Sequence, residues 1–122
     1  MLNYLIDSSF IYESGLEKLK KLSDSNNQLY INNFTLKELT KERETFPIVH
    51  KILDNINENS NKIEFTIDKS KIIIKILNLY SEDSLNNDSR IIETLSKNSS
   101  LILLSSDKNL NFIAKSKELK VI

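Results

Sequence analysis

Short apolar runs alternate with longer segments of helical spacing along this sequence, and that order constrains the fold more than any other feature. Strands are predicted at LNYLI (2–6), QLYI (28–31), KIEFTI (62–67), LILL (101–104) and KVI (120–122). Helices are predicted over 9–22, 34–44, 47–57, 68–80, about 88–97 and about 108–117. Such alternation is typical of an α/β fold with a mainly parallel sheet and helices on both faces.

Length and composition narrow the class of protein. The 122 residues are the size of one domain and show no linker, so we expect a single domain over 1–122. Seventeen acidic and seventeen basic residues cancel, so charge alone does not indicate a nucleic-acid binder. The absence of cysteine excludes disulfides, zinc–thiolate sites and cysteine nucleophiles, and is compatible with a cytoplasmic location. We expect neither a signal peptide nor a membrane span, because a strand begins at once and no apolar stretch approaches about 18 residues.

Two aspartates follow predicted strands. Asp7 comes after the first strand, in LIDSS, and Asp107 after the fourth, in LLSSDKNL. Both strands have the composition of buried, central strands. Because ligands of open parallel sheets bind outside the carboxyl ends of the strands, we expect the two carboxylates to lie together at that edge.

Two further acids belong to predicted helices. Glu38 shares the inward face of FTLKELTKE, and Asp88 shares a face with the apolar stripe of NNDSRIIETL. Each of the four acids has an ordinary structural alternative, as a helix cap, a first-turn residue or a half-exposed side chain. Four acids converging on one edge cannot all stay ionised without a cation, however, and oxygen ligands without cysteine or histidine suit Mg²⁺ or Mn²⁺.

A divalent ion held by carboxylates indicates phosphate chemistry, because the ion can activate water and neutralise a scissile phosphate. The hydroxyl groups of Ser9, Ser105 and Ser106 are expected to position ligands or water beside it. Arg90 and Lys108 adjoin the predicted site and are the best placed basic residues to hold a nucleic-acid backbone. The ordinary alternative for any one of the basic residues is a solvated face.

Four blocks of the sequence resemble PIN-domain ribonucleases, and together they extend over essentially its whole length. They are YLIDSSFI, INNFTLKEL, NNDSRIIETL and LILLSSDKNLNFIAKSKELKVI, of which the last is the most specific. The family's acidic positions correspond to Asp7, Glu38, Asp88 and Asp107. Its hydroxyl positions correspond to Ser9 and to one of the two serines before the last acid.

The resemblance implies a three-layer α/β/α sandwich with a five-stranded sheet of order 3-2-1-4-5. It also implies metal-dependent endoribonuclease activity that leaves a 5′-phosphate and a 3′-hydroxyl. Homodimers are frequent in the family, so a homodimer is expected. Some relatives are toxins paired with an antitoxin and others process RNA, so an antitoxin or an RNA-processing partner protein is expected too.

Two alternatives to a nuclease remain open. Many relatives carry a further acid just after the last aspartate, where this chain has Asn109 and Asn111, so a weak or inactive module that binds RNA or protein is the first alternative. The second is a phosphoacceptor signalling domain, which would leave Glu38 without a role. Tyr12 and His50 are interpreted as structural, and IIIKIL (72–77) as core or as a dimer interface.

Overall fold

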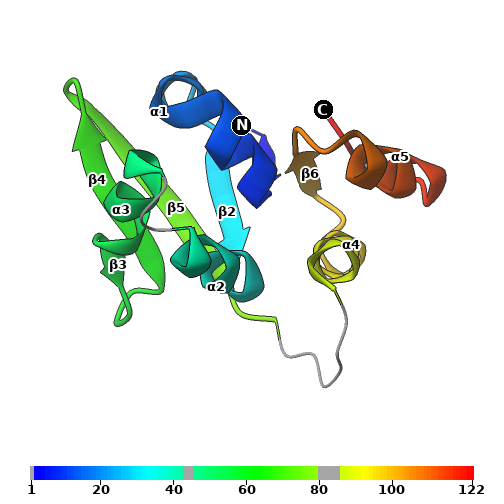
Figure 1. Ribbon diagram of the computed structural model, residues 1–122. Helices are drawn as coiled ribbons and strands as arrows, with labels where there is room; N and C mark the ends of the chain where they lie inside the picture. The colour runs from blue at the N-terminus through cyan, green and yellow to red at the C-terminus, as the bar shows by residue number, and fades with distance from the viewer. Residues whose placement is uncertain (1, 43–45, 80–85) are drawn as a thin grey trace.

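The computed structural model describes residues 2–42, 46–79 and 86–122 (Figure 1). In chain order its elements are β1 (Asn3–Ile6), α1 (Ser8–Asp24), β2 (Gln28–Asn32), α2 (Asn33–Lys41), α3 (Pro47–Leu53), β3 (Ile56–Asn57), β4 (Lys62–Ile67), β5 (Ser70–Leu77), α4 (Asn87–Lys97), β6 (Leu101–Leu104) and α5 (Lys108–Ser116). The α/β class is confirmed, and most elements begin and end within a few residues of the predicted bounds. Within the described ranges, no helix combines the length and the apolar character that a membrane crossing requires.

The sheet is mixed, and its strand order is β3-β4-β5-β2-β1-β6. Strands β5, β2, β1 and β6 pair in parallel, whereas β3 and β4 pair antiparallel. The predicted order 3-2-1-4-5 is therefore wrong, because the strand predicted at 62–67 does not lie beside β2. The strand predicted at 120–122 is reduced to one parallel bridge, between Val121 and Leu103.

Two apolar clusters lie on opposite faces of the sheet. Tyr4 and Ile6 belong to the cluster that packs under α1, α2 and α3, whereas Leu5 belongs to the cluster that packs under α4 and α5. This is the alternation that a strand buried on both faces requires. Figure 1 shows α1, α2 and α3 together beside β2, β5 and β4, and α4 and α5 together beside β6. Helices therefore cover both faces of the parallel part.

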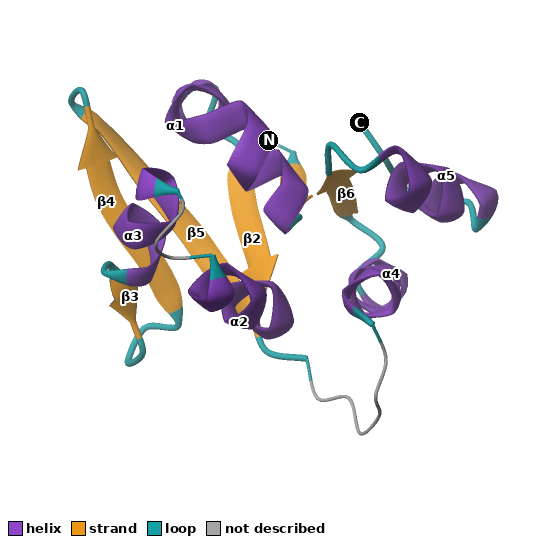
Figure 2. Ribbon diagram, viewed as in Figure 1, coloured by secondary structure: helices purple, strands orange, loops and turns teal. Residues whose placement is uncertain are grey.

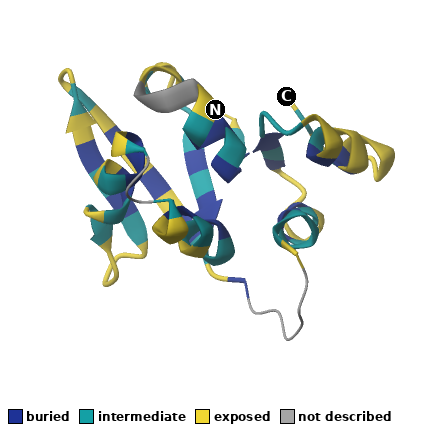
Figure 3. Ribbon diagram, in the orientation of Figure 1, coloured by how far each residue is buried: buried dark blue, intermediate teal, exposed yellow. Residues whose placement is uncertain are grey.

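The largest error of the sequence interpretation is the helix predicted over 68–80. This segment instead forms β5, which pairs with β4 in a hairpin (Figure 2). Its even-numbered isoleucines are buried and its odd-numbered residues from Lys71 to Lys75 are exposed, an alternation that Figure 3 shows as bands along β5. β-Branched side chains favour this period of two. Asp68 and Lys69 both have positive φ angles, of 45° and 70°, as a two-residue hairpin turn requires.

Smaller differences concern element ends. The helix predicted over 47–57 ends at Leu53, since Ile56–Asn57 pairs with β4 as β3. Asp7 is the residue at the N-cap position of α1, but its side chain forms no capping hydrogen bond. Asn32 caps α2, because its side chain accepts a hydrogen bond from the amide of Thr35 at 2.7 Å. Residues 43 and 44 of the helix predicted over 34–44, and residue 80 of the helix predicted over 68–80, lie outside the described residues.

Candidate active site

The parallel part of the sheet brings the candidate residues to one edge. Strands β1, β2 and β6 are each followed by a helix, so α1, α2 and α5 begin at the carboxyl ends of the strands. The register pairs Ile6 with Leu104, and the amide of Asp7 continues the pairing by donating to the carbonyl of Leu104 at 3.0 Å. The positive ends of these helix dipoles therefore face the space into which the carboxylates are placed.

Asp7 is buried, with 7% of its surface exposed, and it does not use its side chain as a helix cap. Its Oδ2 atom accepts hydrogen bonds from the hydroxyls of Ser9, at 2.7 Å, and Ser105, at 2.9 Å. The Ser9 hydroxyl also accepts from the amide of Ser106, and the Ser105 hydroxyl from the amide of Asp107, both at 3.0 Å. The capping alternative for Asp7 therefore fails, and its carboxylate instead joins the ends of β1 and β6.

Asp107 caps α5 with its side chain, as its position directly before that helix allows. Its Oδ1 atom accepts from the amides of Asn109, at 2.9 Å, and Leu110, at 3.2 Å, which caps α5. In the described part of the chain, no hydrogen bond engages its other oxygen. The cap thus holds the Asp107 carboxylate in a defined orientation and leaves Oδ2 for another ligand.

Asp88 lies half-buried in the first turn of α4, where Asn86 rather than Asp88 caps the helix. Burial raises the pKa of Asp88 above its ordinary value, and the charges of Asp107 and Asp7 raise this pKa further. Asp107 and Asp7 are therefore close enough to act electrostatically on Asp88, although the three residues come from distant segments. A positive ion between them would reverse this penalty.

Glu38 is held by side chains from two other helices. Its Oε1 atom accepts from the hydroxyl of Ser8 at 3.0 Å, and its Oε2 atom accepts from the side-chain amide of Asn87. These contacts join α2 to the first turn of α1 and to the first residue of α4. Glu38 and Asp7 both act on Tyr12, since burial and the charges of Glu38, Glu42 and Asp7 together raise the pKa of the Tyr12 phenol to about 12.

The donor chemistry of this edge fits a hard divalent ion, but its geometry supplies few protein ligands. Among the described residues, no group of three or more carboxylate, histidine or cysteine side chains is arranged to hold a metal ion. Mg²⁺ commonly keeps several waters and takes only one or two carboxylates, with substrate phosphate completing its shell. The residues therefore fit a divalent ion held by Asp107, by one of Asp7 and Asp88, and by a phosphate of the substrate.

Two predicted substrate residues differ in their surroundings. The Arg90 guanidinium lies over the ring of Phe34, 3.8 Å from its centroid, so it joins α4 to α2. Lys108 is exposed at the first residue of α5, directly after Asp107.

The predicted serines differ as well, because Ser105 donates its hydroxyl to Asp7 and Ser106 donates its backbone amide to Ser9. Tyr12 stacks on Phe46 at 4.5 Å between ring centroids, as its structural interpretation implied.

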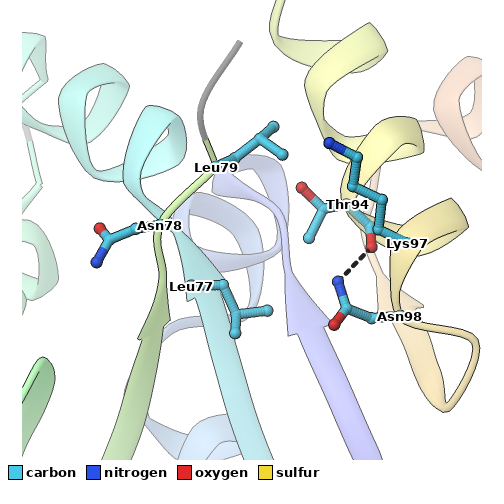
Figure 4. A pocket seen from close by; sticks show the side chains of 6 residues that line it. All are labelled: Leu77, Asn78, Leu79, Thr94, Lys97 and Asn98. Atoms are coloured by element: carbon cyan, nitrogen blue, oxygen red, sulfur yellow. Dashed lines mark hydrogen bonds between the residues drawn. The ribbon is translucent and has the colours of Figure 1, made fainter.

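Clefts of the surface only partly coincide with this edge. One, of about 340 Å³, lies between the end of β5 and α4 and contains none of the predicted site residues (Figure 4). In it Leu77 points toward Asn98, whose side-chain amide donates to the Thr94 carbonyl at 2.8 Å. A second, of about 310 Å³, is lined by Asn86, Asp88, Ser89, Ile92, Ile113 and Lys117. The second cleft therefore opens beside a candidate carboxylate.

Two residues of the edge were not among the predicted site residues. The hydroxyl of Ser8 and the side-chain amide of Asn87 both donate hydrogen bonds to the carboxylate of Glu38. Their only sequence signal is adjacency, because Ser8 follows Asp7 and Asn87 precedes Asp88. Comparison with known proteins adds no relative, since no family model matches the sequence and no curated protein matches it.

Proposed function

We propose that this chain is a PIN-like, metal-dependent endoribonuclease that hydrolyses phosphodiester bonds of RNA. The observation that carries the proposal is that Asp7 and Asp107 follow the paired parallel strands β1 and β6, with Asp88 close enough for both charges to raise its pKa. The charges of Asp107 and Asp7 disfavour ionisation of Asp88, and a bound cation would favour it. Glu38 faces the same edge from α2, held by Ser8 and Asn87.

The proposed cofactor is Mg²⁺ or Mn²⁺, bound by the aspartates with Glu38 as a further ligand or an outer carboxylate. Such an ion supplies an acidified water and neutralises charge on the scissile phosphate. The chain's own residues do the positioning: Ser9 and Ser105 orient the carboxylate of Asp7, and the α5 cap orients that of Asp107. Lys108, exposed beside the cap, would hold an RNA phosphate, and cleavage would leave a 5′-phosphate and a 3′-hydroxyl.

A weak or inactive PIN-like module that binds RNA or protein is the second candidate. It is favoured by the amides at Asn109 and Asn111, where an acid would strengthen metal binding, and by the small number of ligands that the described residues bring together. A homodimer, and either an antitoxin or an RNA-processing protein as partner, belong to both proposals. Titration with Mn²⁺ in the presence of an uncleavable RNA analogue separates the candidates, because an enzyme binds the ion more tightly with the analogue present.

The decisive experiment compares RNA cleavage by the wild type, Asp7→Asn and Asp107→Asn in Mn²⁺ and in EDTA. Asparagine caps helices about as well as aspartate, so Asp107→Asn removes the charge but keeps the cap of α5. Cleavage should require Mn²⁺ and fall roughly 100-fold or more in both variants, as expected when a group that handles the reacting proton or metal is lost. Circular dichroism should show that both variants fold, and Asp107→Ala reports the separate effect of losing the cap.

Full activity in Asp7→Asn, or cleavage that survives EDTA, would contradict the mechanism. Activity lost from Asp107→Ala but kept in Asp107→Asn would assign Asp107 to the helix cap alone. Binding of RNA without any cleavage in Mn²⁺ would favour the second candidate.

A further inference from the structure

We propose that the outer face of α5 is a stacking surface for single-stranded RNA, with Phe112 as the platform and Lys108 and Lys115 as its phosphate contacts. This inference rests on the proposed function, since it supplies the flanking subsite of the same substrate. It goes beyond that function by assigning a stacking role to Phe112 and a phosphate-binding role to Lys115.

The first observation is the exposure of Phe112. Its side chain is 73% exposed, and no other aromatic side chain in the described segments is exposed. The other described aromatic rings are buried or half-buried, as with Phe10 in the core, Phe46 against Tyr12 and Phe34 beneath Arg90. Figure 3 shows that α5 is exposed over much of its surface.

The second observation is the arrangement of charge around this ring. Lys108 precedes Phe112 by four residues and Lys115 follows it by three, so both lie on the same helical face as the ring. Leu110 and Ala114 are buried on the opposite side, which fixes the orientation of that face toward solvent. An apolar ring between two cations is the combination by which proteins bind single strands without reading sequence.

The third observation is the excess of lysine in α5 and the segment that follows it. Residues 108–120 contain four lysines and one glutamate, a net charge of +3 in a chain whose formal net charge is zero. Within the described part of the chain these four lysines form no ion pair, whereas Lys20, Lys62, Lys71 and Lys97 each pair with an acid. Charge complementarity therefore favours a polyanion as the occupant of this face.

The position of the face fits one substrate strand. Phe112 follows the capping residue Asp107 by five positions, which is about 7.5 Å along a helix axis. That distance is about two nucleotides of a strand with stacked bases, at ~3.4 Å per nucleotide. A phosphate beside Asp107 would thus place a base one or two nucleotides away against the Phe112 ring.

The test is fluorescence anisotropy of the full chain in EDTA with a labelled single-stranded RNA of about ten nucleotides, and with the same RNA annealed to its complement. Phe112→Ala should weaken single-strand binding about 5-fold or more and leave duplex binding within about two-fold. Phe112→Leu should lose nearly as much, because it keeps apolar area but has no ring face, and Phe112→Trp should bind at least as tightly as the wild type. Lys115→Gln should reduce the salt dependence of binding, whereas Lys51→Gln, on the exposed side of α3, is the matched control.

Single-strand affinity of Phe112→Ala within about two-fold of the wild type would overturn the inference, as would full binding by Phe112→Leu. A change of molar mass in light scattering with unchanged RNA affinity would assign the face to a protein contact and would equally overturn it. Because binding is measured in EDTA, the result is independent of cleavage: an inactive chain that loses binding in Phe112→Ala contradicts the nuclease but keeps this surface.

Discussion

The site region, built from β1, β2 and β6 with the helices that follow them, contrasts with the hairpin of β4 and β5. In the site region, Asp7 contacts Ser105, which lies 98 positions away in the sequence, and the strands are parallel. In the hairpin, the partners from Ile67↔Ser70 to Lys62↔Lys75 are close in sequence and antiparallel. The site region contains the candidate carboxylates, whereas the hairpin contains none of the residues proposed for catalysis.

The two regions of the sheet therefore differ in what they contribute to the protein. The hairpin is stabilised mainly by fully buried isoleucines that join the core under α1 and α3, so its contribution to stability is mostly apolar. The site region places the buried carboxylate of Asp7 and the carboxyl of Asp88, whose pKa is raised, near one edge, an arrangement that is favourable only with hydrogen-bond donors or a cation. Changes in the hairpin should therefore alter stability alone, and changes in the site region should depend on pH and metal ions.

The largest effect is expected from Ile74→Ala in β5. Ile74 is fully buried and pairs with Leu29 on one side and with Ile63 on the other, so its truncation leaves a cavity at the centre of the sheet. We expect the free energy of unfolding in urea to fall by about 2–5 kcal/mol. Ile73→Ala, whose side chain is 37% exposed on the other face, should cost less than about 1 kcal/mol. Equal losses in the two variants would contradict the alternation of β5.

The next effect is expected from Ser105→Ala in the site region. Removing this hydroxyl takes one donor from the buried Asp7 carboxylate and the acceptor from the amide of Asp107. Unpaired buried polar groups cost about 1–3 kcal/mol, so urea unfolding should show a loss in that range. Ser106→Ala is the matched control, because the described residues give its hydroxyl no hydrogen bond, and it should stay within ~0.5 kcal/mol of the wild type. The opposite ranking would show that Ser106 is the structural hydroxyl.

A gain in stability is expected from Lys69→Gly in the hairpin turn. Lys69 has a φ angle of 70°, a conformation that costs a residue with a Cβ atom about 1 kcal/mol relative to glycine. The midpoint of urea unfolding should therefore rise. The same substitution at Lys51, in helix α3, should lower stability by about 1 kcal/mol, because glycine is a poor helix former. Changes of the same sign at both positions would contradict the turn conformation.

The smallest effect is expected from Asp88→Asn, and it should depend on pH. The folded state raises the pKa of Asp88 above 3.8, so ionisation of this carboxyl destabilises the fold as pH rises from that value through the raised pKa. The variant should therefore be more stable than the wild type at neutral pH, and the difference should disappear in acid. Thermal unfolding across this range measures it, with Glu58→Gln, in the exposed turn after β3, as the control for a lost charge.

Added Mn²⁺ sharpens the same measurement. If Asp88 is a ligand, the ion stabilises the wild type more than Asp88→Asn, and the difference at neutral pH narrows. An unchanged difference in Mn²⁺ would remove Asp88 from the proposed metal site.

Much of the parallel part was predictable because its signals are local. Apolar runs followed by hydroxyl or amide residues mark β1, β2 and β6 and the starts of α1, α2 and α5. The segment of β5 was mispredicted because IIIKIL suits a buried helix as well as a strand when its partner is unknown. The hairpin was not predicted from the Asp68–Lys69 turn, because residues with positive φ in two-residue turns are usually glycine or asparagine.

The candidate site was predictable in residue type but not in contacts. The position of Asp7 and Asp107 after strands placed both at the same edge, and the register of Ile6 with Leu104 agrees with this. The choice between Ser105 and Ser106, and the binding of Glu38 by Ser8 and Asn87, depend on side-chain distances across elements. No spacing along the chain encodes those distances.

The sequence by itself determined the α/β class, the order of most elements and the acids that follow the strands, because each depends on periodicity and on capping chemistry within a few residues. Only the tertiary structure decided that β5 separates β4 from β2, that Asp107 caps α5 while Asp7 does not cap α1, and that Arg90 lies over Phe34. These outcomes depend on which buried surfaces and polar groups meet across distant segments, and that is a property of the packed chain rather than of any local stretch.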